Sequence, residues 1–175
     1  MKTTNVISKA PLASKFVSSP LRNRIKLELN ASVNEVWQLV GDPGRMPEYS
    51  EGLKSVETKQ DENGNCTEYL CHFKPTTEGE PGIDHRVVMK WYEPLKGWAS
   101  LDEEPNAFGL KESLTLITFE SKNDKTILRW DMHFNADDVE MNRSSLEMAL
   151  NDISKRLIDR FGGKVIETFV EGKKQ

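Results

Sequence analysis

The segment from Arg24 to Glu57, RIKLELNASVNEVWQLVGDPGRMPEYSEGLKSVE, constrains the fold more than any other part of the chain. It opens with alternating apolar and polar residues, the pattern of a half-buried strand. Ser32 and Glu35 then have capping-box spacing, and the apolar face of a helix follows them. An Asp-Pro-Gly break at 42–44 ends that helix. The segment therefore predicts a strand, two short helices and a second strand.

The rest of the chain has the pattern of an antiparallel meander closed by one helix. Turn signals separate five further strand candidates: 66–74, 83–93, 98–104, 112–121 and 126–135. An apolar stripe then recurs at steps of three and four residues before a Gly-Gly stop, and it consists of Leu146, Leu150, Ile153, Leu157 and Phe161. A stripe extending over about 36 Å of helix predicts a helix that lies across the sheet.

Composition excludes several classes of function. A chain of 175 residues with 37% hydrophobic and 30% charged residues has the size of one globular domain. A net charge of -4 does not favour a nucleic-acid partner. No apolar run approaches the roughly 20 residues of a transmembrane helix. Cys66 and Cys71 lie on opposite faces of one strand and cannot pair, which indicates a reducing, cytoplasmic compartment.

The chain begins differently from its body. No acidic residue occurs before Glu28, and basic residues alternate with Ser and Thr. There is no continuous apolar core for a secretory signal, and a transit peptide would contain more arginine. We therefore expect a mobile basic arm over 1–23, or an added edge strand near Lys15. The main domain is expected over 24–163, and a tail with some docking over 164–175.

This order of elements resembles the START-like or SRPBCC superfamily, the helix-grip proteins, and most closely its polyketide cyclase/dehydrase branch. The resemblance covers 24–163, and its most specific residues are Val36 and Trp37, the Asp-Pro break and Tyr49. It implies an α+β helix-grip fold in which a seven-stranded curved antiparallel sheet wraps around the long C-terminal helix, with two short helices between strands 1 and 2. It also implies a cavity between the sheet and that helix.

The alternation of each strand predicts which side chains face this cavity. Tyr69 faces inward and His72 outward, while His133 faces solvent. In the strand 83–93 the inner face is Ile83, His85, Val87, Met89 and Trp91, and in 126–135 it is Leu128, Trp130, Met132 and Phe134. Aromatic and methionine side chains offer a polarizable apolar surface for a flat or flexible ligand. The predicted ligand-binding residues are Tyr69, Met89, Trp91, Trp98, Phe108, Trp130, Met132 and Phe134.

His85 is the one histidine placed in the cavity, and it raises a catalytic alternative. A neutral imidazole oriented by Asp102 would suit removal of a proton next to a carbonyl, as in a cyclase or dehydratase. A four-residue loop at 94–97 turns Asp102 inward, whereas a three-residue loop turns it outward. The other two histidines point away and the cysteines are split, so neither a metal nor another cofactor is expected.

Three functions follow in order of preference. The first is binding or transport of a small hydrophobic molecule, such as a lipid, quinone, polyketide or isoprenoid. The second is the cyclase or dehydratase that uses His85 and Asp102. The third is a co-chaperone-like interaction module that uses the arm and the tail, and a homodimer is left open. The loops 75–82 and 103–111 are expected around the entrance, with Phe108 swinging over a ligand.

Overall fold

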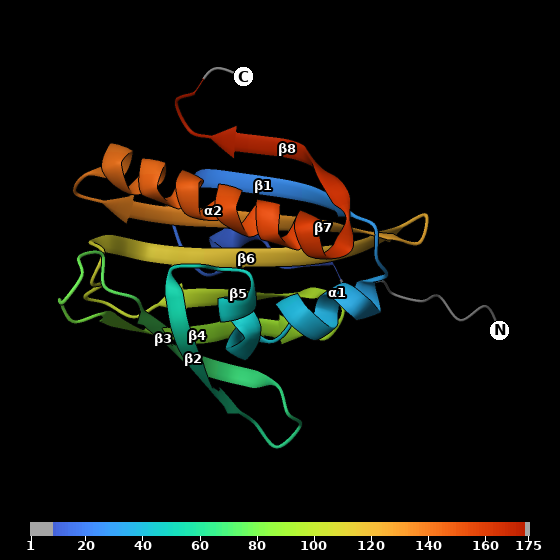
Figure 1. Cartoon of the computed structure of the whole chain (residues 1–175), viewed down its shortest axis with the longest axis horizontal. Coiled ribbons are helices and arrows are strands. Elements are labelled where there is room, and N and C mark those ends of the chain that lie inside the picture. Colours follow the sequence, from blue (N-terminus) through green and yellow to red (C-terminus); the bar gives the residue numbers. More distant parts are fainter. Residues whose placement is uncertain (1–8, 174–175) are drawn as a thin grey trace.

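The computed structural model describes residues 9–173 and forms one curved sheet with the three longer helices on its concave side (Figure 1). The helices are η1 (Ala13–Lys15), α1 (Val33–Val40), η2 (Pro43–Glu48) and α2 (Val139–Phe161), of which η1 and η2 are 3-10 helices. The strands are β1 (Leu21–Leu29), β2 (Leu53–Gln60), β3 (Cys66–Phe73), β4 (Ile83–Glu93), β5 (Gly97–Asp102), β6 (Leu110–Lys122), β7 (Lys125–Ala136) and β8 (Gly163–Val170).

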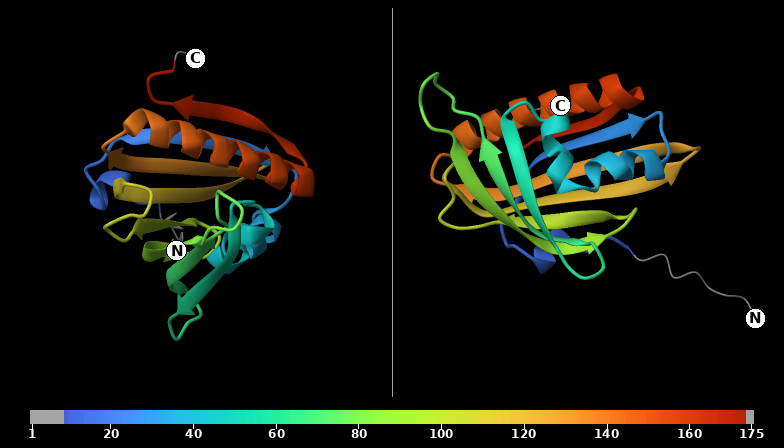
Figure 2. Two further views of the ribbon diagram at one scale, coloured as in Figure 1. Left: turned by 60° about the vertical axis from the view of Figure 1, so that its left-hand side comes forward. Right: turned by 60° about the horizontal axis from the view of Figure 1, so that its bottom comes forward.

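The strands pair in the order β2-β3-β4-β5-β6-β7-β1-β8, and each strand is antiparallel to its neighbours. The sheet bends around α2, which crosses its concave side (Figure 2). Buried residues of α2, among them Leu150, Ile153 and Leu157, share one core with Ile25 and Leu27 of β1. The predicted α+β helix-grip fold, with two short helices between β1 and β2, is confirmed.

The segment from Arg24 to Glu57 folds as its sequence indicates. The Ser32 hydroxyl accepts a hydrogen bond from the Glu35 amide, and the Glu35 carboxylate accepts one from the Ser32 amide, which completes the capping box. Two aromatic side chains of the sheet then bind the last carbonyls of α1. Trp98 Nε1 donates to Val40 O at 3.1 Å, and the Tyr92 hydroxyl donates to Gly41 O at 2.8 Å. These bonds seat α1 against the inner face of the sheet.

The prediction of seven strands is wrong by one, because residues assigned to a docked tail form β8. Gly162 and Gly163 turn the chain back at the end of α2, and β8 then pairs antiparallel with β1 from Leu29 opposite Gly163. This pairing satisfies the hydrogen-bonding edge that β1 would otherwise expose. Arg24 of β1 strengthens it, since its guanidinium binds Asp131 of β7 in a bidentate pair and lies 3.7 Å from Glu167 of β8.

Residues 9–20 of the expected arm lie against the convex face and residues 21–23 begin β1, whereas residues 1–8 lie outside the described part of the chain. Val17 is buried in a second apolar cluster with Ala99, Leu114 and Leu116. The prediction that His133 faces solvent is wrong, because this segment covers it: His133 Nδ1 lies 3.4 Å from Ser19 O. Burial lowers the pKa of His133. The strand alternation gave the correct face, but it could not show that another segment covers that face.

The Gly163 position gives a test of the turn into β8. Its φ is +123°, and a Cβ there would lie 1.9 Å from Glu28 O. Gly163→Ala should therefore lower the free energy of unfolding by roughly 2–4 kcal/mol, measured by urea denaturation. Gly64→Ala is the control, since Gly64 has φ +78° with nothing within 4 Å of the added Cβ. An equal effect of the two changes would show that the close approach to β1 is unimportant.

His72 on the convex face gives a pH-dependent test. Its Nε2 lies 2.8 Å from Glu57 Oε2 of β2, and its Nδ1 lies 2.7 Å from Asp84 Oδ1 of β4. Hydrogen bonds to Glu57 and then Asp84 raise the pKa of His72 above 6.5. The folded state thus binds the proton more tightly, and this stabilisation is fully present below about pH 6.5 and is lost as pH rises through the raised pKa.

We expect the wild type to lose more stability than His72→Gln between pH 6 and pH 8, measured by urea denaturation. The difference between the two proteins is the relevant quantity, because His133, whose pKa is lowered, acts in the opposite direction. Parallel pH profiles for the two proteins would contradict the role given to His72.

Candidate ligand cavity

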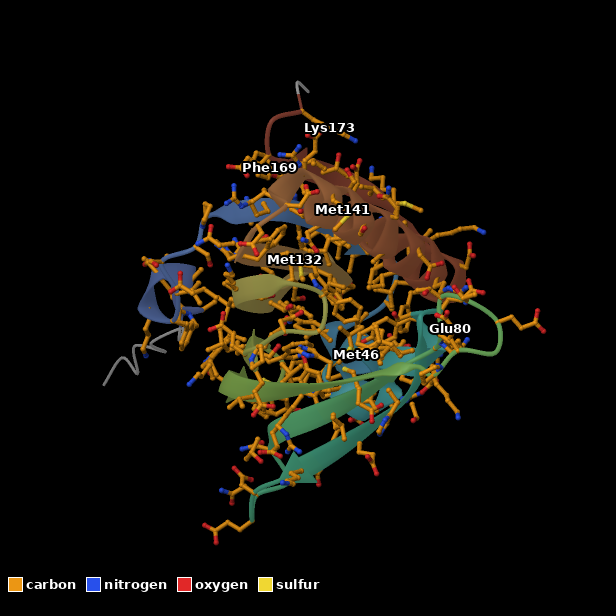
Figure 3. All side chains as sticks on the ribbon, turned by 90° about the vertical axis from the view of Figure 1, so that its left-hand side faces the viewer. Met46, Glu80, Met132, Met141, Phe169 and Lys173 are labelled. Carbon is orange, nitrogen blue, oxygen red and sulfur yellow. The ribbon has the colours of Figure 1, made fainter. Side chains whose placement is uncertain are left out.

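A cavity of about 580 Å³ lies between the inner face of the sheet and the N-terminal half of α2. Its lining residues Met141, at the start of α2, and Phe108, in the β5–β6 connection, are exposed, and we call this end of the cavity its mouth. The start of α2 and the β5–β6 connection lie at the left of Figure 1. Figure 3 looks at this end, with Met141 of α2 and Met46 of η2 on opposite sides of Met132 of β7. The volume is within the range of small-molecule sites.

Most of the cavity wall is apolar. The sheet, η2 and the loops contribute Met46, Ser50, Leu53, Tyr69, Cys71, Phe73, His85, Val87, Trp98, Asp102, Ala107, Phe108, Leu110, Thr115, Trp130 and Met132. The helix α2 contributes Met141, Asn142, Ser145, Leu146, Ala149, Leu150 and Ile153. Small side chains at Ser145 and Ala149 leave space beside the helix. Further along the helix, Leu157 is fully buried in the core and outside the wall.

Aromatic residues form the inner part of the cavity. Trp98 packs edge to face on Tyr69 and lies 6.3 Å from Trp130, measured between ring centroids. The hydroxyls of Tyr69 and Ser100 share a hydrogen bond of 2.9 Å, so the polar atom of Tyr69 is satisfied within the wall. Burial raises the pKa of Tyr69 well above its usual value, and it raises the pKa of Cys71 to about 12. Both groups therefore stay neutral and present an uncharged wall.

A β-bulge in β4 determines which face of the sheet two of the predicted site residues, Trp91 and Asp102, occupy. Met89 pairs with Ser100 and Trp91 with Ala99, so Lys90 is an extra residue without a partner. Trp91 consequently turns to the convex face and packs in the cluster around Val17. Its predicted place on the inner face is wrong, because strict alternation assumes a regular strand.

The same bulge turns Asp102 inward. The β4–β5 loop has three residues, which alone would direct Asp102 outward, but the extra residue in β4 shifts the pairing by one. Asp102 therefore lies opposite Val87 and on its face. The correct orientation results from a loop and a bulge that compensate each other, and the sequence analysis weighed only the loop.

The other predicted residues divide into those that line the cavity and those that do not. Tyr69, Trp98, Phe108, Trp130 and Met132 are in its wall together with His85 and Asp102. Met89 packs against the core without lining the cavity. Phe134 is fully buried below the guanidinium of Arg22, 5.9 Å from its ring centroid, and is also outside the wall.

The polar groups gather at the mouth of the cavity. His85 Nε2 lies 3.5 Å from Asp102 Oδ1, and Asn106 of the β5–β6 connection reaches both residues. Asn106 Nδ2 lies 3.1 Å from Asp102 Oδ2 and 3.4 Å from His85 Nε2. Phe108 covers this group, with its ring edgewise to Phe73 at 5.0 Å and to His85 at 6.2 Å between centroids. His85 is buried, whereas Phe108 is 38% exposed.

Sequence reasoning missed Asn106 and the contribution of η2 and α2 to the wall. No periodicity identifies Asn106, because it lies in a loop between strands. Ser145 and Ala149 could have been found as small residues beside the apolar stripe at Leu146 and Leu150. Met46 lies in the short helix that the sequence predicted, but its place in the cavity wall depends on how η2 packs on β2 and β3.

The family model described as "Polyketide cyclase / dehydrase and lipid transport" matches residues 24–165. The chain belongs to this family. The match covers the sheet from β1 to β7 and all of α2, which are the elements that form the cavity. No curated protein is similar enough in sequence to count as a match.

Solved structures show the same fold at low sequence identity. A START superfamily protein from Mycobacterium smegmatis is 13% identical with a TM-score of 0.66, covering 81% of this chain and 97% of that one. Protein XoxI from Bacillus cereus is 16% identical with a TM-score of 0.65, covering 80% and 95%. A norcoclaurine synthase from Thalictrum, bound to a transition-state analogue, is 15% identical with a TM-score of 0.54, covering 82% and 98%.

Two negative observations concern the described residues alone. Over 9–173 no three His, Cys, Asp or Glu side chains converge in a way that could hold a metal ion. The helices in the same range are too short or too polar to span a bilayer.

Proposed function

We propose that this protein binds a small hydrophobic molecule in the cavity between the sheet and α2, as a carrier or sensor of that molecule. The observation that carries the proposal is the apolar cavity of about 580 Å³. Cavities of this size that are lined mainly by apolar side chains are typical of small-molecule sites. A lipid, quinone, polyketide or isoprenoid has the required apolar surface. Membership of a family that includes lipid transport supports the same proposal.

Exposed side chains at the mouth suit a cavity that a ligand enters and leaves. Phe108 and Met141 are 38% and 59% exposed, and both are in the cavity wall. Further along α2, ion pairs hold the helix to the segment before β2. Arg156 pairs with Glu51, and Arg160 Nη1 lies 3.1 Å from Glu48 Oε1. The first half of α2 is held as well, since Asn23 Nδ2 donates to Arg143 O at 3.1 Å. We therefore expect the connection carrying Phe108, and not the helix, to move when a ligand enters.

Filling the cavity should remove binding. Ala149 lines the cavity from an exposed position of α2, so Ala149→Trp places an indole in the cavity while the backbone of the helix is kept. We expect at least a tenfold loss of affinity for N-phenyl-1-naphthylamine, measured by its fluorescence. The control is Met148→Trp, because Met148 is 74% exposed and outside the wall. Equal probe binding by both variants would contradict binding in this cavity.

A second candidate function is proton abstraction from a bound carbonyl compound, the chemistry of a cyclase or dehydratase. The observation that favours it is the pair of His85 and Asp102, 3.5 Å apart inside the mouth. In this step His85 Nε2 takes a proton from the carbon next to the carbonyl, an enolate forms, and the nearby carboxylate of Asp102 stabilises the imidazolium. Return of a proton to carbon regenerates the imidazole.

This function can be measured without knowing the substrate. In D₂O the protein should accelerate exchange of the α-protons of 2-tetralone, followed by NMR. His85→Ala should lower the accelerated rate by roughly 10²–10⁴-fold, the usual contribution of a general base. His72→Ala is the control, because His72 lies on the convex face with Glu57 and Asp84. Unchanged exchange in His85→Ala would dismiss His85 as the base.

A further inference from the structure

The cavity wall has one fixed charge. Among the described residues that line it, Asp102 is the only carboxylate, and none is Lys or Arg. The Asp102 side chain is 16% exposed, and the ion pair recorded for it is the 3.5 Å contact with His85. An ionised group in such an apolar site requires a counter-charge. Whether His85 supplies it depends on the protonation of the imidazole.

The hydrogen bonds around Asn106 favour an imidazole that leaves this charge unbalanced. The backbone amide of Phe108 donates to Asn106 Oδ1 at 2.7 Å, which fixes the orientation of the Asn106 amide. The NH₂ group must therefore face the other two residues. One of its hydrogens is donated to Asp102 Oδ2, and the other points to His85 Nε2. Donation of this hydrogen to Nε2, 3.4 Å away, requires an imidazole without a proton on that nitrogen, and such an imidazole does not balance the charge of Asp102.

Asp102 also retains capacity to bind a ligand. A carboxylate has about four acceptor positions, and Asn106 occupies one of them at Oδ2. Its charge acts on the surrounding wall, because Asp102 contributes to the raised pKa of both Cys71 and Tyr69. The side chain lies beside the Phe108 connection at the mouth, so a charged group of a ligand could reach it while the apolar part occupies the inner cavity.

From this lone carboxylate we infer that the cavity selects hydrophobic molecules that bear a protonated amine and rejects those that bear a carboxylate. The ammonium would donate to Asp102 at the mouth, and the apolar body would pack on Trp98, Trp130 and Met132. A carboxylate in the same place would meet a like charge without a cationic partner in the wall. This inference rests on the proposed binding function and adds the charge of the ligand to it.

The test uses three probes of one shape: 2-naphthylmethylamine, 2-naphthylmethanol and 2-naphthoate. Each displaces N-phenyl-1-naphthylamine from the wild type at pH 7, and the fluorescence gives its affinity. We expect the amine to bind at least tenfold more tightly than the naphthoate, with the alcohol between them. A naphthoate that binds as tightly as the amine to the wild type overturns the inference, whatever any variant does.

The variant Asp102→Asn assigns the selectivity to this residue. It keeps the shape of the side chain and an oxygen that can accept from Asn106, and it removes the charge. The amine should lose about tenfold in affinity, and its advantage over the naphthoate should fall below about threefold. Glu103→Gln is the matched control, since Glu103 is exposed and pairs with Arg86 at 3.6 Å outside the wall. It should retain the full selectivity.

The two levels of proposal fail in different ways. If N-phenyl-1-naphthylamine and all three naphthalene probes fail to bind to the wild type, the proposed binding function fails. If the probes bind but the selectivity is absent, or persists in Asp102→Asn, the inference about Asp102 fails and the binding function stands.

Discussion

The apolar contact between α2 and β1 holds the rest of the molecule in place. Leu150, Ile153 and Leu157 of the helix are buried in one core with Ile25 and Leu27 of the strand. The helix begins at the mouth of the cavity, where Met141 and Ser145 are in the wall, and its later residues are buried in the core. Beside the first half of α2, the small side chains of Ser145 and Ala149 leave a gap between the helix and the inner face of the sheet. The cavity is the space that results.

The mouth of the cavity depends on a smaller irregularity. The extra residue Lys90 in β4 turns Trp91 out of the interior and brings Asp102 to the same face as His85 and Val87. Asn106, held by the amide of Phe108, then orients both polar residues. The polar groups at the mouth and the connection that covers them are therefore held in place by the same few residues.

Much of the fold could be predicted from local patterns. Capping residues, the Asp-Pro break and the spacing of apolar residues are read within one turn or one strand, and Ser32 and Glu35 form the bonds that they imply. At the start of α2 the Asp138 carboxylate accepts a hydrogen bond from the Met141 amide, whereas the neighbouring Asp137 carboxylate lies 2.7 Å from Lys111 Nζ. The strand β8 was missed because its pairing with β1 joins residues at opposite ends of the chain.

The sequence by itself determined the order of the elements, the curved sheet with its closing helix, and the inner faces of the regular strands, because these follow from periodicity and capping. Tertiary structure alone decided the width of the cavity, the place of Asn106 and the faces of Trp91 and Asp102. A bulge adds one residue without changing the local pattern of side chains, yet it reverses the direction of every side chain beyond it. Only the pairing of β4 with β5 shows where that reversal occurs.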